Sequence, residues 1–205
     1  MSIIQNRTGI VPPAPHVREA LDVVSNFYKQ LPDLLPTRHL VLDAGCGEGR
    51  HACYLASLGF RVIGIDTDSE MIREAMRRTP QTYLDEGIVR YDQEDIDMLR
   101  FREGTIFGGV VCNETLQLLP LAKRQATVKK LMNITASGGF HLVSAYVGSL
   151  DSGTGARPLS PGSLRRPYDE SGWDVIHFKE DPYEELEFGA KVAVSSIASI
   201  VAIKP

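Results

Sequence analysis

The stretch Val41-Leu42-Asp43-Ala44-Gly45-Cys46-Gly47-Glu48-Gly49-Arg50 decides the fold. A short apolar run at 39–43 leads into three closely spaced glycines, and a helical pattern then runs over 50–58 until Gly59 ends it. This order predicts a strand, a glycine turn and a helix. In an open parallel sheet, ligands bind beyond the carboxyl ends of the strands, where glycine lets the backbone approach a ligand that a Cβ would block.

The pattern of strand and helix continues on both sides of this stretch. An amphipathic helix is predicted at 15–29, a second strand at 61–66 is followed by capping residues at 67–69 and another helix, and the remaining predicted elements are strands at 87–91, 107–112 and 140–146 and a helix at 121–135. Two β-type runs at 173–179 and 192–203 suggest an antiparallel pair. The sequence therefore predicts an α/β fold: a Rossmann-like, seven-stranded, mostly parallel sheet with helices on both faces and an antiparallel C-terminal strand pair.

The length of 205 residues, with 43% hydrophobic residues, suits one good-sized core, so we expect a single domain over 1–205. Residues 1–14 are rich in proline towards their end and are predicted to be a mobile lead. Residues 147–162 are rich in Gly, Ser and Pro, and unstructured segments of this length often serve as lids, so we treat them as a candidate lid loop.

Composition also argues against several classes of protein. The net charge of −4 comes from mixed acidic and basic residues without a basic stripe, so nucleic acid is not an expected partner. Three cysteines without CxxC spacing and scattered histidines argue against a disulfide framework and a metal site. The sequence shows no signal segment and no apolar run long enough for a bilayer, so we expect a cytoplasmic protein without a membrane partner. The oligomeric state is not predicted.

An acidic residue follows the glycine turn at the spacing that is typical of nucleoside-binding sites. Asp66 stands 21 residues after Gly45, at the end of the next strand, where a carboxylate can accept both hydroxyls of a ribose. The turn also satisfies the G-x-G-x-x-A form of a dinucleotide fingerprint at 47–52, so a nicotinamide-dependent oxidoreductase that binds NAD is an alternative. Asp43 and Glu48 would lie beside the pyrophosphate of NAD, whereas they would attract the sulfonium and ammonium groups of S-adenosylmethionine (SAM).

These residues carry a resemblance to a known family. The segment 41–50, followed by Gly64-Ile65-Asp66, resembles the first two motifs of class I SAM-dependent methyltransferases, and the segment 94–101 resembles the third. The resemblance implies that the acid of the third motif, Asp95, accepts from the adenine amino group and that the Ile96 backbone amide also contacts adenine; Asp92 competes for the role of Asp95. The complete set of predicted cofactor-binding residues is Asp43, Gly45, Cys46, Gly47, Asp66, Thr67, Asp95, Ile96 and Asn113.

A narrower likeness covers much of the chain. The segments 50–56, 110–119, 131–144 and 164–173 are similar to tellurite-resistance methyltransferases of the TehB type. This resemblance implies methyl transfer to a small-molecule acceptor, such as a soft chalcogen or thiol-like compound. Gly108 stands where that family has an aspartate, and residues 187–188 lack its His-Arg pair, so a non-catalytic SAM-binding protein is a further alternative.

Methyl transfer from a sulfonium chiefly requires alignment of the acceptor and exclusion of water, and a base helps only an acceptor that must lose a proton. The candidate catalytic residues are His16 and Arg165. His16 is similar to a histidine in the N-terminal helix of the TehB-type family and is a candidate base, with Glu114 as a lesser one; the alternative is an exposed helix histidine. Arg165 could bind an anionic acceptor through its planar fork, or could belong to a solvated helix face.

Overall fold

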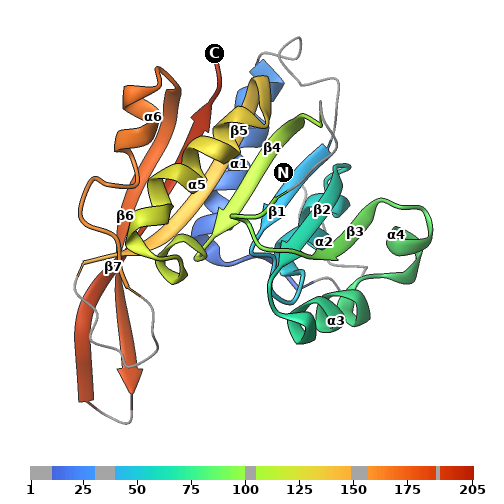
Figure 1. Ribbon diagram of the computed structural model, residues 1–205, viewed down its shortest axis with the longest axis horizontal. Coiled ribbons are helices and arrows are strands. Elements are labelled where there is room, and N and C mark those ends of the chain that lie inside the picture. The colour runs from blue at the N-terminus through green and yellow to red at the C-terminus, as the bar shows by residue number, and fades with distance from the viewer. Residues whose placement is uncertain (1–10, 31–39, 100–104, 149–156, 188–189) are drawn as a thin grey trace.

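The computed structural model describes residues 11–30, 40–99, 105–148, 157–187 and 190–205. Its strands form one seven-stranded sheet in the order β3-β2-β1-β4-β5-β7-β6 (Figure 1). Their bounds are β1 Leu40–Ala44, β2 Arg61–Asp66, β3 Val89–Gln93, β4 Phe107–Asn113, β5 Thr135–Val147, β6 Asp174–Glu187 and β7 Ala190–Ile203. Strands β1 to β5 pair in parallel, and β7 runs antiparallel to both β5 and β6. The predicted Rossmann-like sheet is confirmed.

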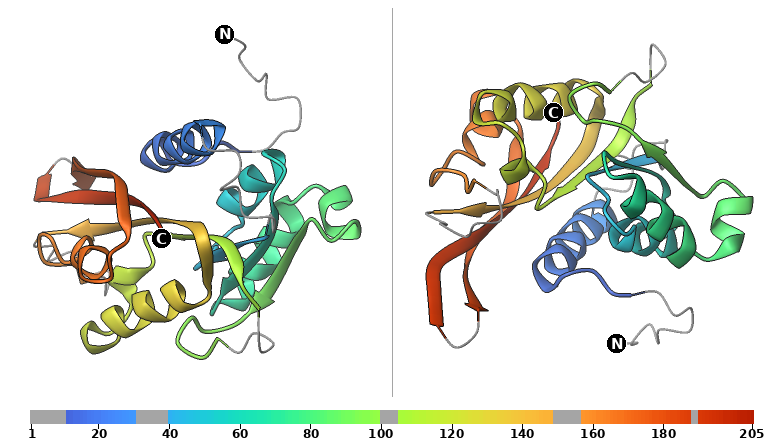
Figure 2. Two further views of the ribbon diagram at one scale, coloured as in Figure 1. Left: turned by 90° about the horizontal axis from the view of Figure 1, so that it is seen from above. Right: turned by 60° about the horizontal axis from the view of Figure 1, so that its bottom comes forward.

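Helices cover both faces of the sheet, and Figure 2 shows α1 and α5 on opposite sides of it. The helices are α1 Pro15–Gln30, α2 Arg50–Ser57, α3 Ser69–Arg78, α4 Gln81–Asp85, α5 Leu121–Asn133 and α6 Arg166–Glu170, with a 3-10 turn, η2, at Leu116–Leu118. The first three helices bury residues such as Val17, Leu55 and Ala75 in one core cluster. The other cluster lies under α5, α6 and η2 and contains Leu131 and Tyr168. Burial on both faces explains the nearly continuous apolar character of β4 and β5.

Some boundaries differ from the sequence-based expectations. Helix α5 ends at Asn133, and β5 begins at Thr135 rather than at 140, because Thr135 pairs with Phe107 across a register shift in β4. Strand β6 continues to Glu187, well past the predicted end at 179, through backbone pairing with β7. Hydrogen bonds between strands need no apolar alternation, so the charged sequence of this part of β6 gave no signal.

Glycine permits one close contact at the centre of the sheet. A Cβ on Gly109 of β4 would lie 2.3 Å from the ring of Phe140 in β5, which is far inside van der Waals contact. The small residue therefore lets the aromatic ring lie against the backbone of the neighbouring strand.

Parts of two predicted segments lie outside the described residues: 1–10 of the predicted mobile lead and 149–156 of the candidate lid loop. The end of the latter segment is described, and there Leu159 bridges Val147 at the end of β5. None of the helices described has the length and apolar character needed to cross a membrane.

Candidate cofactor and acceptor site

The glycine turn after β1 is fixed to the end of β2. The amides of Gly45 and Cys46 both donate to the Ile65 carbonyl at 2.9 Å. Gly45 has φ +77°, and a Cβ there would lie 2.1 Å from the Thr115 hydroxyl, so only glycine fits. At Gly47, φ is +50° and no atom lies within 4 Å of the position a Cβ would take. The backbone at Gly47 is thus open to a ligand.

Asp66 lies directly against this turn. One oxygen of its carboxylate accepts the Gly47 amide at 2.9 Å, and the other accepts the Asp68 amide at 3.0 Å. The carboxylate therefore stands at the carboxyl end of β2, beside the open backbone. The next residue, Thr67, is exposed, and its carbonyl accepts from the Gln93 side chain at 3.1 Å.

Asp43 is a buried acid without a partner. Its side chain is fully buried near the end of β1, and neither carboxylate oxygen has a well-formed hydrogen bond to the described residues. Burial raises the pKa of Asp43 to about 7; the backbone amide of Ala52 opposes this rise, and the negative charge of Asp66 adds to it. An orphaned carboxylate costs free energy unless a cation or a donor reaches it. This position suits a ligand with a positively charged group.

The segment after β3 provides the third side of the site. The Glu94 amide donates to the Asp66 carbonyl at 2.9 Å, which brings the following residues to the end of β2. Asp95 is half-buried and accepts the Asp97 amide at 2.8 Å, and Ile96 is buried. Asp92, in contrast, is held in a bidentate pair with Arg90 on the same strand. Because Asp92 is occupied by Arg90, the geometry favours Asp95 as the acid available to a ligand at the carboxyl ends of the strands.

The residues that suggested a dinucleotide have structural roles. A Cβ on Gly49 would lie 2.3 Å from the Tyr91 hydroxyl and 2.9 Å from the Ala75 side chain, so packing alone requires glycine there. Glu48 forms an ion pair with Arg78. The orphaned carboxylate of Asp43 would repel a pyrophosphate placed on this turn.

A second group of polar side chains lies at the carboxyl ends of β4 and β5. The Asn113 side-chain oxygen contacts His16 Nε2 of α1 at 3.0 Å and also accepts from the Ser144 hydroxyl. His16 Nε2 lies 3.5 Å from a carboxylate oxygen of Glu114, and the other oxygen accepts from the Tyr146 hydroxyl at 3.2 Å. We call these five residues the His16 cluster. Thr115 links it to the glycine turn, since its hydroxyl donates to both the Ala44 and the Asn113 carbonyls.

Two members of this cluster were missed from the sequence. Ser144 faces Asn113 only through the parallel register of β4 and β5, which residue spacing alone does not reveal. Tyr146 is the last residue of the strand predicted at 140–146. Its position near a carboxyl strand end, where ligands bind in parallel sheets, is the signal in the sequence that points to it.

Arg165 does not join the His16 cluster in any contact described. Its guanidinium pairs with Asp169 at 3.1 Å, one helical turn away, and lies 5.7 Å from the ring centre of Phe178. These contacts keep it on the α6 and β6 side of the sheet. The described contacts fit the solvated-face alternative better than a place at the strand ends.

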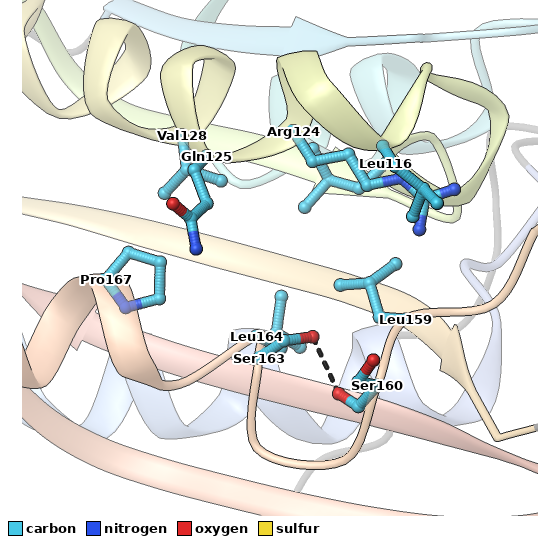
Figure 3. A pocket seen from close by; sticks show the side chains of 10 residues that line it. Leu116, Arg124, Gln125, Val128, Leu159, Ser160, Ser163, Leu164 and Pro167 are labelled. Atoms are coloured by element: carbon cyan, nitrogen blue, oxygen red, sulfur yellow. Dashed lines mark hydrogen bonds between the residues drawn. The ribbon is translucent and has the colours of Figure 1, made fainter.

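A small cavity of about 150 Å³ lies between α5 and the segment leading into α6 (Figure 3). Its walls are mostly apolar and include Leu116, Val128 and Leu164. The guanidinium of Arg124 also lines it, but donates to four backbone carbonyls, those of Gln117, Leu119, Arg157 and Pro158. Arg124 is therefore a structural clasp and has little donor capacity left for a ligand.

Gly108 lies near the start of β4, away from the carboxyl end where Asn113 stands, so the missing aspartate at 108 does not remove a group from the strand ends. Among the described residues, no three His, Cys, Asp or Glu side chains come together in a way that could hold a metal ion.

The central part of the chain is similar to known proteins. Residues 41–139 match the family model of a methyltransferase domain. The chain is 28% identical over 130 residues to 2-heptyl-1-hydroxyquinolin-4(1H)-one methyltransferase from Mycobacteroides abscessus, covering 61% of this chain and 55% of that protein. It is 26% identical over 145 residues to the probable S-adenosyl-L-methionine-dependent methyltransferase TehB from Haemophilus influenzae, covering 69% of this chain and 48% of that protein.

The structural comparison agrees with this fold. The crystal structure of TehB from Haemophilus influenzae matches with a TM-score of 0.70 and 21% identity, over 90% of this chain and 62% of that one. The chain spans only about half the length of the two relatives named above. The predicted resemblance to SAM-dependent methyltransferases, TehB included, is confirmed.

Proposed function

We propose, on the premise that residues 41–139 belong to a SAM-dependent methyltransferase domain, that this chain transfers a methyl group from SAM to a small-molecule acceptor. The observation that carries the proposal is the pair of carboxylates beside the glycine turn, one in β1 and one at the end of β2. Asp66 lies against the Gly47 backbone, and Asp43 is buried without a partner. One acid suits a ribose and the other a cationic group, and SAM contains both.

Each side of the site receives a role in this proposal. Asp66, next to Thr67, accepts the ribose hydroxyls, and Asp95 accepts from the adenine amino group while Ile96 offers its backbone amide. Gly45, Cys46 and Gly47 contribute backbone rather than side chains, since the Cys46 thiol is buried. Asp43 offsets the ammonium charge of the methionine part, and Asn113 borders that part from the end of β4.

Methyl transfer from a sulfonium requires the protein chiefly to align the two reactants and to exclude water from the site. The cofactor supplies a methyl group on a positively charged sulfur, which is already an excellent leaving group. The residues of the chain then have to hold the acceptor in line with that methyl and exclude water. The His16 cluster lies on the β4 and β5 side of the turn, so we place the acceptor there.

The acceptor class is proposed from two relatives. The resemblance of the sequence to tellurite-resistance methyltransferases implies a soft chalcogen or thiol-like acceptor, and the relative from Mycobacteroides abscessus is named for a hydroxylated heteroaromatic compound. Both are small molecules. Neither contains the extended phosphate backbone that a nucleic-acid substrate would bring to this acidic chain.

Isothermal titration with S-adenosylhomocysteine (SAH), and in parallel with NAD, tests the cofactor. We expect the wild type to bind SAH and not NAD. Asp66→Ala should weaken SAH binding by roughly tenfold or more, because hydrogen bonds to a charged acceptor contribute about 1.5–3 kcal/mol each. Asp92→Ala, one strand away and paired with Arg90, is the matched control and should bind normally. NAD binding in place of SAH binding would refute the proposal.

A further inference from the structure

The His16 cluster contains a strained residue. Glu114 has φ +50°, and it is the one non-glycine residue with positive φ among those described. This conformation costs an L-residue roughly 1–2 kcal/mol and persists only where the surroundings enforce it. Here the Glu114 amide donates to the Ser144 carbonyl at 2.9 Å, and its carboxylate is held by Tyr146 and Asn113. This strained backbone conformation places the Glu114 carboxylate 3.5 Å from His16 Nε2.

The surrounding groups also define which nitrogen of His16 carries hydrogen. Nε2 faces the Asn113 oxygen at 3.0 Å and the Glu114 carboxylate at 3.5 Å, and both are acceptors. The Ser144 hydroxyl lies 3.4 Å from Nε2, but its own hydrogen goes to Asn113. Nε2 must therefore be the donor. In a neutral imidazole this leaves Nδ1 with a free lone pair, and Nδ1 has no hydrogen-bond partner within the described part of the chain.

The orientation of Asn113 follows from the same contacts. With its oxygen towards His16 and Ser144, its amide nitrogen donates to Glu114 at 3.4 Å. The reverse orientation would set the Asn113 oxygen against a carboxylate oxygen of Glu114, and two acceptors repel each other. Asn113 therefore locks the tautomer of His16.

From this geometry we propose that His16 is the proton acceptor of the reaction, that Glu114 and Asn113 are its positioning residues, and that the methyl acceptor carries an ionisable hydroxyl or thiol hydrogen. This inference rests on the proposed methyltransferase function and specifies its substrate class. A lone-pair donor without such a hydrogen would gain nothing from a base.

The proposed step moves one methyl group and one proton. A lone pair on the acceptor oxygen or sulfur forms the new bond to the methyl carbon, and the bond from that carbon to the sulfonium sulfur breaks with its electron pair on sulfur. The acceptor hydrogen passes as a proton to Nδ1 of His16. The resulting imidazolium keeps its Nε2 hydrogen towards Glu114, whose negative charge stabilises it.

The position of the cluster supports this role. Its link through Thr115 places it one residue from the glycine turn, and the side chain of His16 is 11% exposed while that of Glu114 is 31% exposed. The cluster is therefore largely shielded from solvent, yet part of its surface is accessible to a small molecule. The titratable groups facing His16 are Glu114 at the end of β4, Tyr146 of β5, which donates to Glu114, and His51 of α2, whose pKa burial lowers to about 4.

The tautomer can be measured without any substrate. In protein labelled with ¹⁵N-histidine, the His16 signals are identified by their loss in His16→Gln. We expect the neutral His16 imidazole to carry hydrogen on Nε2. A spectrum with hydrogen on Nδ1 would overturn the assignment of the base.

The substrate class is tested with simple acceptors. SAH release is followed with 4-methylphenol, with 4-nitrophenol, which is far more acidic, and with thiophenol at mildly alkaline pH. We expect Glu114→Gln to lower kcat on 4-methylphenol by roughly tenfold or more and on 4-nitrophenol by less than about threefold, because an ionised acceptor needs no base. Glu19→Gln, which removes an exposed partner of Lys179 on the same helix as His16, should change neither.

Equal losses on both phenols would overturn the base role, and a wild type that methylates no phenol or thiol would overturn the substrate class. SAH binding distinguishes these failures from failure of the proposed function. Titration of Glu114→Gln with SAH should give wild-type affinity, so loss of turnover with intact binding concerns the acceptor step alone.

Discussion

Asp43 shows that a residue of a binding site can lower the free energy of unfolding of the ligand-free protein. Its carboxylate is buried and unpartnered, and its pKa rises from 3.8 to about 7 because burial disfavours the charged form. The folded protein therefore holds this proton more tightly than the unfolded chain between these two values. The free energy of unfolding should fall as pH rises through that window, and the loss should be complete above about pH 7.

Asp43→Asn tests this dependence. The neutral amide has no proton to lose, so the ligand-free variant should be more stable than the wild type at about pH 8, by up to ~4 kcal/mol, since one pKa unit corresponds to about 1.4 kcal/mol. Near about pH 4 the two proteins should differ little. Urea denaturation at both pH values gives the comparison. An identical pH dependence in the variant would show that Asp43 is not the group responsible.

Asp92 and Asp95 offer a matched pair for the adenine end of the site. Asp92 is engaged by Arg90, whereas Asp95 stands after β3 beside the end of β2. Asp95→Asn preserves an oxygen for the Asp97 amide but weakens acceptance from the adenine amino group, so SAH affinity should drop roughly five- to tenfold. Asp92→Asn should leave it unchanged. Titration calorimetry on both variants would reveal the reverse order if the register of the third motif were shifted.

Sequence reasoning was strongest where the chemistry is local. The glycine turn and Asp66 stand in one continuous stretch, so spacing alone predicted that they meet. His16 was found only through a family resemblance, and its contact with Asn113 joins residues 97 positions apart. Ser144 was missed because its partner is set by the strand register. Long-range pairing of this kind is decided by packing, which a pattern in one chain segment does not encode.

At the scale of elements, Arg124 joins three segments that are separate in sequence. Its guanidinium on α5 donates to carbonyls of Gln117 and Leu119 near η2 and to those of Arg157 and Pro158 before α6. A backbone bond from the Arg157 amide to the Gln117 carbonyl completes the connection. Helical periodicity predicted α5 but gave no hint of this clasp, because a buried arginine normally pairs with an acid.

Arg124→Lys should loosen this connection. A lysine retains the charge but cannot reproduce the fork, so several carbonyls lose their donor, and we expect the free energy of unfolding to fall by about 1–3 kcal/mol. Faster hydrogen exchange should appear at the amides of Arg157 and Leu159. Arg77→Lys, on the exposed face of α3, serves as the control and should be neutral. Unchanged exchange at both amides would mean that the backbone bonds alone hold the segment.

Helices and strands were predicted well where burial imposes a regular spacing of apolar residues, and poorly where it does not. The helix stripes of α1 and α3 and the apolar strands β1, β2 and β4 match their expected ranges closely. The charged end of β6 and the short helices α4 and α6 have no such stripe. Their conformation follows from pairing with β7 and from local turn hydrogen bonds.

At the scale of the whole molecule, the proposed cofactor site depends on three strands that the glycine turn alone does not join. Asp43 lies one residue before the end of β1, Asp66 ends β2 and Asp95 follows β3, and the negative charge of Asp66 adds to the rise in the pKa of Asp43. The ligand-free protein therefore holds unfavourable charge at this edge. A ligand with a cation at one end and hydrogen-bond donors at the other would relieve that repulsion and tie the strands together.

Ligand-linked stability tests this consequence for the entire fold. Saturating SAH, at about 100 times its Kd, should raise the free energy of unfolding by ~2.7 kcal/mol, because it binds only the folded state. The amides of Gly47, Asp68 and Glu94, which connect the three strand ends, should exchange more slowly at the same time. Asp66→Ala should lose most of both effects at the same SAH concentration, and NAD should produce neither. If SAH stabilised the protein while these three amides exchanged as before, the ligand would have to bind elsewhere on the molecule, since a bridge across β1, β2 and β3 cannot form without restraining them.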